Sequence, residues 1–176
     1  LDKASFDFQS NTNVLSTYHV EERDVAVGFR ESDEIFEDVY TSQKIQYGHI
    51  EPHAAVAYWE PSGKLVIYTS TQTPSSIRAQ LAELFKLPQS KVRVIVPFVG
   101  GGYGAKTHPR LEPLVSVLAR KAHRPVQWAL TREEVFLTAH CQAALVKLKT
   151  GVKRDGRIVA RQVEAIYDAG AYALTS

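Results

Sequence analysis

The chain has 176 residues, about the size of one domain, and its 44% apolar and 23% charged residues favour a folded globular protein over a disordered one. Lys and Arg number 21 against 19 acidic residues, and the net charge of +2 gives no indication of a nucleic-acid or anionic-membrane partner. One cysteine excludes an internal disulfide and a thiolate cluster, and charged residues interrupt every apolar stretch before the roughly 18 residues of a membrane span.

The two ends of the sequence indicate a piece of a longer polypeptide. The sequence begins with Leu1, contains no methionine, and stops in mid-pattern at Ser176. A processed mature protein is the alternative. No signal-peptide pattern opens the chain, and a single cysteine favours a reducing compartment, so we expect a cytoplasmic location.

Residues 1–48 form a polar, weakly patterned N-terminal segment. We interpret its acidic stretch, residues 31–38, as the solvated face of a helix. From residue 49 the pattern sharpens, since residues 54–59 and 65–70 are apolar-rich and flank a Pro-Ser-Gly sequence typical of turns. We expect these two runs to pair as a β-hairpin.

Two amphipathic helices are expected on either side of a strand. Thr73 and Pro74 form a favourable N-cap and first-turn pair for a helix that ends before Pro88. Residues 91–99 first alternate valine with polar residues and then become wholly apolar, which indicates a strand entering a core. The apolar positions at helical spacing are Ile77, Leu81, Leu84 and Phe85 in the first helix, and Leu111, Leu114, Val115, Leu118 and Ala122 in the second, which is expected to begin near Thr107 or Pro109 and to end at His123–Pro125.

The remaining elements are a strand, a short helix and a hairpin. A strand is expected over residues 126–130, and Thr131-Arg132-Glu133-Glu134 fits the capping box of a helix start. Asp155-Gly156 predicts a hairpin between residues 144–152 and 157–167. The basic side chains of this hairpin indicate a solvated sheet face or a subunit contact. The fold class is therefore α/β in the mixed α+β sense, built from hairpins and strand–helix units.

A glycine-rich stretch, residues 100–107, is the most unusual part of the sequence. Four glycines in five residues carry a large cost in backbone entropy, which points to positive φ angles or to the close approach of a ligand. One interpretation is a tight turn between a strand and a helix. A second is a phosphate loop, because the stretch spells G-x-x-x-x-A-K-T and lacks only one glycine of that motif.

Two further groups of residues are candidate sites. His49, Glu51 and His53 alternate, and on one face of a strand they would form a 2-His-1-carboxylate metal site. A role as scaffold is favoured over that hypothesis, and no metal ligand is assigned to this chain. Cys141 follows His140, but neighbours on a strand face opposite sides, so a structural cysteine is favoured over a thiol nucleophile.

Residues 100–106 read GGGYGAK, and Ser70-Thr71-Gln72 precedes them as an S-T-Q segment. These motifs resemble the molybdopterin-binding large subunit of the xanthine dehydrogenase and aldehyde oxidase family of molybdenum hydroxylases, which commonly has GGGFGGK and an S-T-Q segment. Similarity continues over nearly the whole chain in the family's order. The other matching stretches are His49-Ile50-Glu51-Pro52, Arg132-Glu133-Glu134, His140 and Tyr167-Asp168-Ala169-Gly170-Ala171-Tyr172.

This resemblance implies roles for individual residues. Gln72 would be a catalytic and cofactor-binding residue that donates a hydrogen bond to a ligand of the molybdenum. Gly101, Gly102, Tyr103 and Gly104 would bind the cofactor, with the amides of the last three lining the pterin and the metal. Tyr103 would also line the substrate pocket. Thr107 would join it there.

The sequence departs from the family pattern at three positions in the loop. Tyr103 replaces the usual phenylalanine, and Ala105 replaces a glycine. Thr107 stands where purine-oxidising members have a glutamate that contacts the substrate, which argues against a purine substrate. The family's general-base glutamate and its substrate-gating segment lie downstream, outside this chain.

The resemblance implies an oxidoreductase that hydroxylates an aldehyde or an N-heterocycle with water as the oxygen source. Its cofactor would be molybdenum bound to a molybdopterin, in the cytosine dinucleotide form, and iron–sulfur clusters and FAD would lie on partner subunits or domains. Residues 1–176 would be a fragment of a molybdopterin-binding domain, with a core over residues 49–176, and inactive alone. The alternatives are a P-loop-like nucleotide-binding domain and a non-catalytic structural or assembly module.

Overall fold

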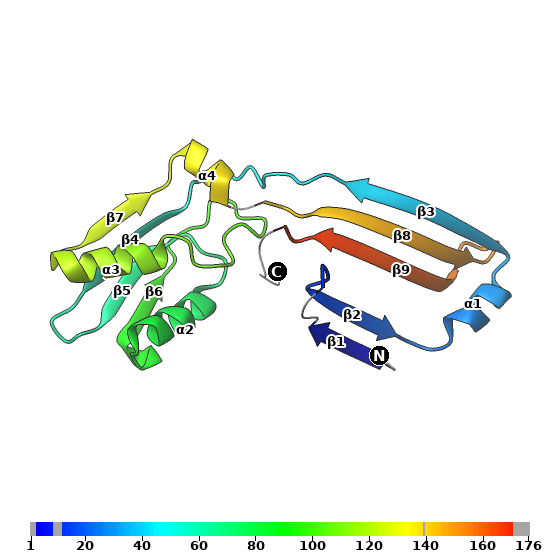
Figure 1. Cartoon of the computed structure of the whole chain (residues 1–176), viewed down its shortest axis with the longest axis horizontal. Coiled ribbons are helices and arrows are strands. Elements are labelled where there is room, and N and C mark those ends of the chain that lie inside the picture. Colours follow the sequence, from blue (N-terminus) through cyan, green and yellow to red (C-terminus); the bar gives the residue numbers. More distant parts are fainter. Residues whose placement is uncertain (1–2, 9–11, 139, 171–176) are drawn as a thin grey trace. The chain divides into compact units, whose positions relative to one another are not determined.

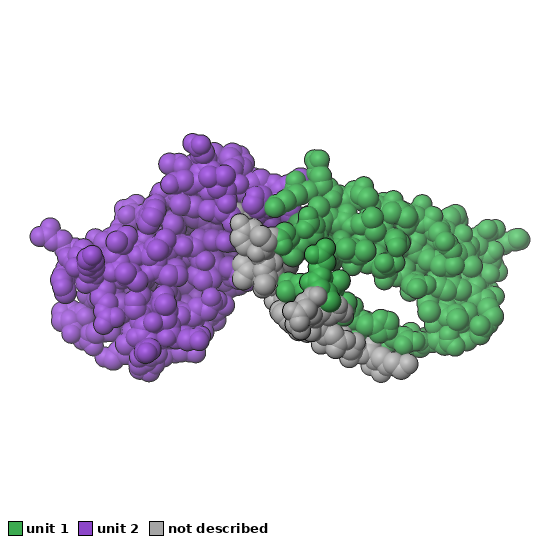
Figure 2. Space-filling model, viewed as in Figure 1, with its two compact units in different colours: residues 1–44, 142–176 green, residues 45–141 purple. Residues whose placement is uncertain are grey.

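The computed structural model describes residues 3–8, 12–138 and 140–170, and of residues 3–8 only the backbone. It divides into two compact units, coloured separately in Figure 2: unit 1 contains residues 1–44 and 142–176, and unit 2 contains residues 45–141. Ile45 and Cys141, the first and last residues of unit 2, pair their backbones in an isolated β-bridge with N···O distances of 2.7 and 3.2 Å. Both units mix helices with hairpins, so the expected fold class is confirmed.

Unit 2 is a four-stranded sheet in the order β6-β5-β4-β7, with helices packed on it (Figure 1). β4 pairs antiparallel with β5 and β7, whereas β5 and β6 are parallel. Parallel neighbours need a crossover connection, and α2 supplies it. The bounds are β4 Ala54–Trp59, β5 Leu65–Thr69, α2 Pro74–Phe85, a 3-10 turn Gln89–Lys91, β6 Val92–Ile95, α3 Glu112–Ala122, β7 Val126–Ala129 and α4 Arg132–Thr138.

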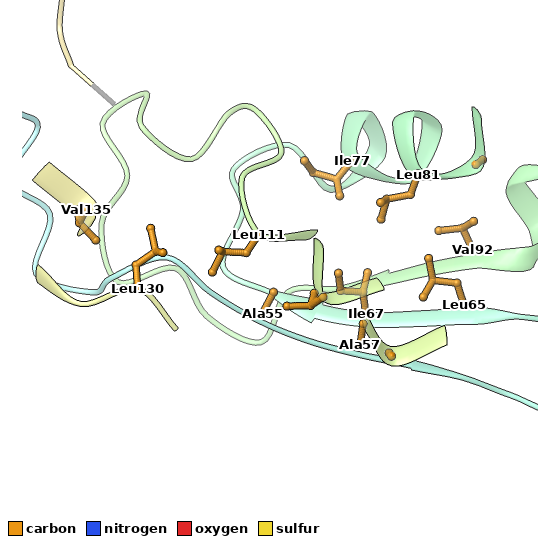
Figure 3. Packing of buried hydrophobic residues seen from close by; sticks show 13 residues of the cluster. Ala55, Ala57, Leu65, Ile67, Ile77, Leu81, Val92, Leu111, Leu130 and Val135 are labelled. Atoms are coloured by element: carbon orange, nitrogen blue, oxygen red, sulfur yellow. The ribbon is translucent and has the colours of Figure 1, made fainter. Parts of the chain in front are cut away.

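The core of unit 2 lies between this sheet and its helices. Figure 3 shows Ile77 and Leu81 pointing from α2 toward the side chains of β5, and both are at most 1% exposed. Their spacing of four residues places them on one face of the helix. The other members of the buried cluster are Ala55, Ala57, Leu65, Ile67, Ala82, Val92, Leu111, Val115, Ala119, Leu130 and Val135. This core fixes the ends of β5 and β6, from which the glycine-rich stretch and its neighbours emerge.

Unit 1 contains a two-stranded and a three-stranded antiparallel sheet. In the larger sheet β8 lies between β3 and β9 (Figure 1). The turn between β8 and β9 has Gly156 at φ +90°, so the hairpin predicted at Asp155-Gly156 is confirmed. The bounds are β1 Lys3–Phe8, β2 Ser16–Glu21, α1 Val25–Glu31, β3 Glu34–Ser42, β8 Ala143–Val152 and β9 Ile158–Asp168.

The interpretation of the acidic stretch as a helix face is wrong. α1 ends at Glu31, and the acidic residues that follow belong to β3 or to the turn before it. Glu37 forms an ion pair of 2.5 Å with Lys149 of β8, and Asp33 one of 3.4 Å with Lys153. The pair of Glu37 and Lys149 joins neighbouring strands, and the pair of Asp33 and Lys153 joins the turns at their ends.

The strand expected over residues 91–99 is shorter than its apolar content indicated. β6 ends at Ile95, and Phe98 is 85% exposed, so the second half of the stretch does not enter a core. Pro97 provides no N–H to a strand ladder, which favours an end at this point. The second helix also starts later than expected, at Glu112. The chain between β6 and α3 is therefore a long connection with the glycines in its middle.

Two further expectations, the capping box at Thr131 and the hairpin of β4 and β5, are confirmed. Thr131 and Glu134 exchange the two hydrogen bonds of a capping box, of 2.8 and 3.2 Å. The hairpin of β4 and β5 forms as predicted.

Among the residues that the structure describes, no helix is long and apolar enough to cross a membrane.

The core assignment predicts the effect of two substitutions on the same helix. Leu81→Ala should lower the free energy of unfolding of unit 2 by about 2–5 kcal/mol, because a 1% exposed side chain leaves a cavity. Leu84→Ala, at a 54% exposed position of α2, should change it by less than about 0.5 kcal/mol. Both tryptophans lie in unit 2, so urea denaturation followed by tryptophan fluorescence measures the difference. Equal losses in the two variants would contradict the packing of α2.

Candidate functional site

The glycine loop, defined as residues 100–107, lies between β6 and α3 of unit 2. Its two ends are held by hydrogen bonds from two other segments, and its middle is not. We call residues 101–103 the loop crown, and residues 49–53 the clamp segment.

The first segment that holds the loop follows β5. The side-chain oxygen of Gln72 accepts hydrogen bonds from the amides of Gly104 (3.1 Å) and Lys106 (3.3 Å). The amide of Gln72 donates in turn to the carbonyl of Lys106 at 2.9 Å. The hydroxyl of Thr71 donates to the same carbonyl at 3.0 Å. The C-terminal half of the loop is thus tied to the end of the core strand.

Thr73 also attaches the loop, and its side chain does so instead of capping the helix as expected. Thr73 occupies the N-cap position of α2, but its side chain makes no cap hydrogen bond. Its hydroxyl donates instead to the carbonyl of Thr107 at 2.6 Å. Pro74, which has no N–H, reduces the need for a cap at this helix start.

The clamp segment holds the loop from another side. One oxygen of Glu51, Oε2, accepts from the amide of Gly100 at 2.7 Å and from the ammonium group of Lys106 at 2.5 Å. The amide of Glu51 donates to the carbonyl of Gly100 at 3.2 Å. His53 donates from Nε2 to the carbonyl of Ala105 at 3.1 Å, because a carbonyl can only accept.

The clamp segment is itself fixed by the start of α4. The guanidinium of Arg132 donates to the carbonyl of His49 at 2.6 Å and to that of Ile50. The amide of Leu130 donates to the carbonyl of His53 at 2.9 Å. The Arg-Glu-Glu motif noted in the sequence therefore contributes a residue that supports the loop through a second segment.

Burial and charge shift the pKa values of three groups around Lys106, whose side chain is only 1% exposed. Burial alone would raise the pKa of Glu51, but hydrogen bonds from Lys106 and the Gly100 amide and the lysine charge outweigh it and keep that pKa below its ordinary value. Burial, followed by the charge of Lys106, lowers the pKa of His49. Burial is also the largest cause of the lowered pKa of His53. Both histidines are therefore neutral at neutral pH.

The loop crown is left free by all these contacts. Among the described residues, the amides of Gly101, Gly102 and Tyr103 have no hydrogen-bond acceptor. Gly101 has φ +94° and Tyr103 has φ +53°, so the backbone turns through conformations that most residues avoid. The ring of Tyr103 is 73% exposed, and its hydroxyl needs no protein partner. Gly101 is half-buried and Gly102 is buried, so only Tyr103 is exposed in the crown. Three adjacent amides without acceptors can bind an anionic or carbonyl-rich ligand that reaches this turn.

The glycines are required partly by the protein itself. A β-carbon on Gly102 would lie 2.7 Å from Cδ of Gln72, and one on Gly100 would lie 2.6 Å from Cβ of Glu51. Gly104 has φ +103°, a conformation that side chains disfavour. Ala105, in contrast, has no positive φ and its buried side chain is 2% exposed, which explains why alanine is accepted there.

The structure places the sequence-predicted site residues in two groups, one around Gln72 and the loop crown and one at Thr107, at the end of the loop. Gln72 and the loop crown lie together, and Gly104 joins them through its amide. That amide already donates to Gln72, so it is engaged within the protein. Thr107 lies at the end of the loop, where its hydroxyl donates to the carbonyl of Gly104 at 2.8 Å. Residues 171 and 172 of the matching Tyr167–Tyr172 stretch lie outside the described residues.

Two alternatives from the sequence find no support. The ammonium group of Lys106 is buried against Glu51, and the next helix starts five residues beyond Thr107, so neither feature of a phosphate loop is present. His49, Glu51 and His53 do not lie on one strand. Within the described part of the chain, no group of three His, Cys, Asp or Glu side chains could hold a metal ion.

Sequence reasoning did not foresee the ion pair between Glu51 and Lys106. The alternation of His49, Glu51 and His53 indicated the segment that holds the loop, but the partners of Glu51 and His53 lie about fifty residues away in the loop. The ring nitrogens of His49 have no hydrogen-bond partner among the described residues. A lysine at the end of a glycine-rich stretch was the other available signal. It was interpreted only as a phosphate ligand.

The chain belongs to the molybdopterin cofactor-binding domain family, whose model matches residues 6–176. The large molybdopterin subunit of nicotinate dehydrogenase from Eubacterium barkeri is 35% identical over 98% of this chain and 41% of its own length. The molybdenum-binding subunit of aldehyde oxidoreductase from Escherichia coli is 37% identical over 69% of this chain and 17% of its own. The chain thus spans less than half of the length of these relatives.

Solved structures support the same assignment. The crystal structure of quinoline 2-oxidoreductase from Pseudomonas putida 86 is similar with a TM-score of 0.69 and 33% identity, over 85% of this chain and 19% of that one. Aldehyde oxidoreductase from Desulfovibrio gigas shares the fold, with a TM-score of 0.71 at 23% identity over 82% of this chain and 16% of that one. The family resemblance seen in the sequence is confirmed.

The neutral histidines predict that unit 2 is less stable in mild acid. A pKa lowered in the folded state, relative to the ordinary 6.5, means that the unfolded chain binds the proton first, so stability is full above 6.5 and falls as the pH drops through that value. Tryptophan fluorescence during urea denaturation should give a lower midpoint at about pH 5.5 than at about pH 7.5. Glu51 stays ionised across this window because its pKa is lowered.

Two variants and a control identify the cause. His49→Leu and His53→Gln, which keeps a donor for Ala105, should each reduce the loss of stability in acid. His123→Asn, at an exposed histidine in the same unit, should leave it unchanged. A loss that persists in full in the double variant His49→Leu/His53→Gln would contradict the assignment.

Proposed function

We propose that this chain supplies part of the molybdenum cofactor site of a molybdenum hydroxylase, an oxidoreductase that oxidises an aldehyde or an N-heterocycle with water as the oxygen source. The observation that carries the proposal is the loop crown, whose three amides have no acceptor in the described part of the chain, next to the side chain of Gln72. Membership of the molybdopterin cofactor-binding family supports it.

The residues present fit such a cofactor. A pterin with its phosphate carries several hydrogen-bond acceptors, and the crown offers three amides without acceptors beside the exposed ring of Tyr103. Gly101 and Gly102 allow a ligand to approach the backbone closely. When bound, the cofactor supplies a metal centre that accepts two electrons from the substrate.

Gln72 is suited to hold one end of the cofactor. Its Oε1 is fixed by the amides of Gly104 and Lys106, so its Nε2 group is oriented by the loop. That nitrogen has no partner among the described residues, and the residue is exposed. We assign Gln72 the role of donating a hydrogen bond to the cofactor at the metal, where a donor stabilises charge that develops during the reaction.

Tyr103 and Thr107 are proposed to line the substrate pocket. The ring of Tyr103 is exposed at the crown and carries a hydroxyl that can bind a heteroatom of the substrate. Thr107 is neutral and already donates to Gly104. It offers no carboxylate to a purine, so we favour an aldehyde or a non-purine N-heterocycle.

The remaining features of the enzyme are proposed by resemblance. The cofactor is expected in the cytosine dinucleotide form, in a cytoplasmic protein. Iron–sulfur clusters and FAD are placed on partner subunits or domains, because one cysteine cannot ligate a cluster. Residues 1–176 are proposed to be part of the molybdopterin-binding domain, with residues 49–176 as the core around the loop.

Substitution of Gln72 in the full-length protein tests the proposed function. Gln72→Ala removes both the loop acceptor and the free donor, whereas Gln72→Glu keeps an acceptor for the two loop amides, removes the donor and adds a negative charge. Both variants should lower kcat by roughly 10² to 10³, the usual effect of losing one such donor. Only Gln72→Ala should also lower the thermal midpoint. An unchanged kcat in Gln72→Glu would contradict the role of Nε2.

A substitution at the crown tests the binding of the cofactor. Gly102→Ala in the full-length protein should displace Gln72, because the new β-carbon would lie 2.7 Å from its Cδ. Molybdenum per folded protein should fall at least about tenfold. Gly63→Ala, where nothing lies within 4 Å of the new carbon, controls for the replacement of a glycine without a steric contact; Gly63 has φ +77°, so the control also carries a backbone strain that Gly102→Ala lacks. Full molybdenum content in Gly102→Ala would count against a cofactor at the crown.

A further inference from the structure

An ion pair between the buried Lys106 and the partly exposed Glu51 joins the two ends of the glycine loop. Oε2 of Glu51 accepts from the amide of Gly100 at 2.7 Å and from Nζ of Lys106 at 2.5 Å, so a single oxygen atom contacts both ends. We propose that Glu51 and Lys106 are positioning residues for the cofactor, because their contact sets the span of the loop and hence the shape of the crown. This inference rests on the proposed function of the crown.

The crown needs such a constraint because it contains few bonds of its own. Gly101 and Gly102 are free to adopt many backbone conformations, and their amides have no acceptor among the described residues. The observed shape places Tyr103 at a positive φ, which is uncommon for a residue with a side chain. Fixing both ends of the loop reduces the conformations that would have to be lost when a ligand binds.

Packing alone does not explain a lysine at position 106. Its side chain is 1% exposed, and burying an ammonium group is unfavourable unless a charged partner is present. An apolar side chain of similar length would fill the same space without needing that partner. The charge of Lys106 is therefore better explained by its contact with the carboxylate of Glu51, which also binds the amide of Gly100.

The two partners belong to segments that are separately braced. Arg132 fixes the clamp segment through the carbonyls of His49 and Ile50. The backbone of Lys106 is bonded to Gln72 through both its amide and its carbonyl. A shift of Lys106 would therefore move Gln72, so the ion pair also supports the orientation of the donor next to the crown.

Paired substitutions in the full-length protein distinguish positioning from simple stabilisation. Glu51→Gln leaves the buried ammonium of Lys106 without a charged partner and should destabilise the fold. The double variant Glu51→Gln/Lys106→Met removes both charges and keeps an acceptor for Gly100, so its thermal midpoint should return toward that of the wild type. In this double variant the ion pair between the two ends of the glycine loop is still absent. Molybdenum and pterin per folded protein should therefore remain roughly ten- to a hundredfold lower than in the wild type.

A second variant decides the question if the double variant does not fold. Glu51→Asp keeps the negative charge but shortens the side chain by about 1.5 Å, too much to contact both partners. It should also lose cofactor. The matched control is the exposed ion pair of Lys147 and Glu164, 3.1 Å apart, where Lys147→Met/Glu164→Gln should change neither the midpoint nor the cofactor content.

The outcomes are separable from those of the proposed function. Low cofactor content in a folded variant supports the positioning role. Wild-type content in the double variant or in Glu51→Asp overturns it, while leaving the proposed function intact. A wild-type protein that contains neither molybdenum nor pterin overturns the proposed function, and with it this inference.

Discussion

The burial of Lys106 is the constraint on which the arrangement of the site depends. An ammonium group that is 1% exposed requires a carboxylate, and Glu51 supplies it from a segment about fifty residues earlier. The same positive charge contributes to the lowered pKa of His49, whose ring lies close to that of His53 with 5.1 Å between their centres. The lysine backbone is bonded to Gln72 on the opposite side. One buried charge thus links the clamp segment, the glycine loop and the end of β5.

Different parts of the glycine loop have different roles. Its termini are fixed by side chains from other segments, and the amides of its crown have no acceptor among the described residues. A rigid frame around a free turn is the arrangement expected of a ligand site, because a preorganised backbone loses little entropy on binding. The chain belongs to the molybdopterin cofactor-binding family, and we propose that this turn binds part of that cofactor. Gly102 makes room for the side chain of Gln72, because a β-carbon there would lie 2.7 Å from Cδ of Gln72.

Local features of the fold could be predicted from the sequence, and long-range ones could not. The turn at Asp155-Gly156 and the capping box depend on neighbouring residues, and both are present. The apolar composition around Phe98 predicts a buried strand, but Phe98 is exposed, because composition alone does not show where a strand ends. The hydroxyl of Thr73 bonds to the loop instead of its helix, and Glu51 binds Lys106, because tertiary contacts determined both. The sequence predicts a binding site at the glycine loop, and that remains a prediction; it does not predict the residues that hold the loop.

Amide hydrogen exchange of the full-length protein, measured with single-residue resolution before and after cofactor loading, tests the central claim most directly. The amides of Gly102 and Tyr103 have no acceptor in the described chain, so they should exchange quickly without cofactor and slow markedly when it binds. The amide of Lys106 already donates to Gln72 and should change little. Unchanged exchange at Gly102 and Tyr103 in a protein that has bound molybdenum would show that the cofactor lies elsewhere, and would contradict the account.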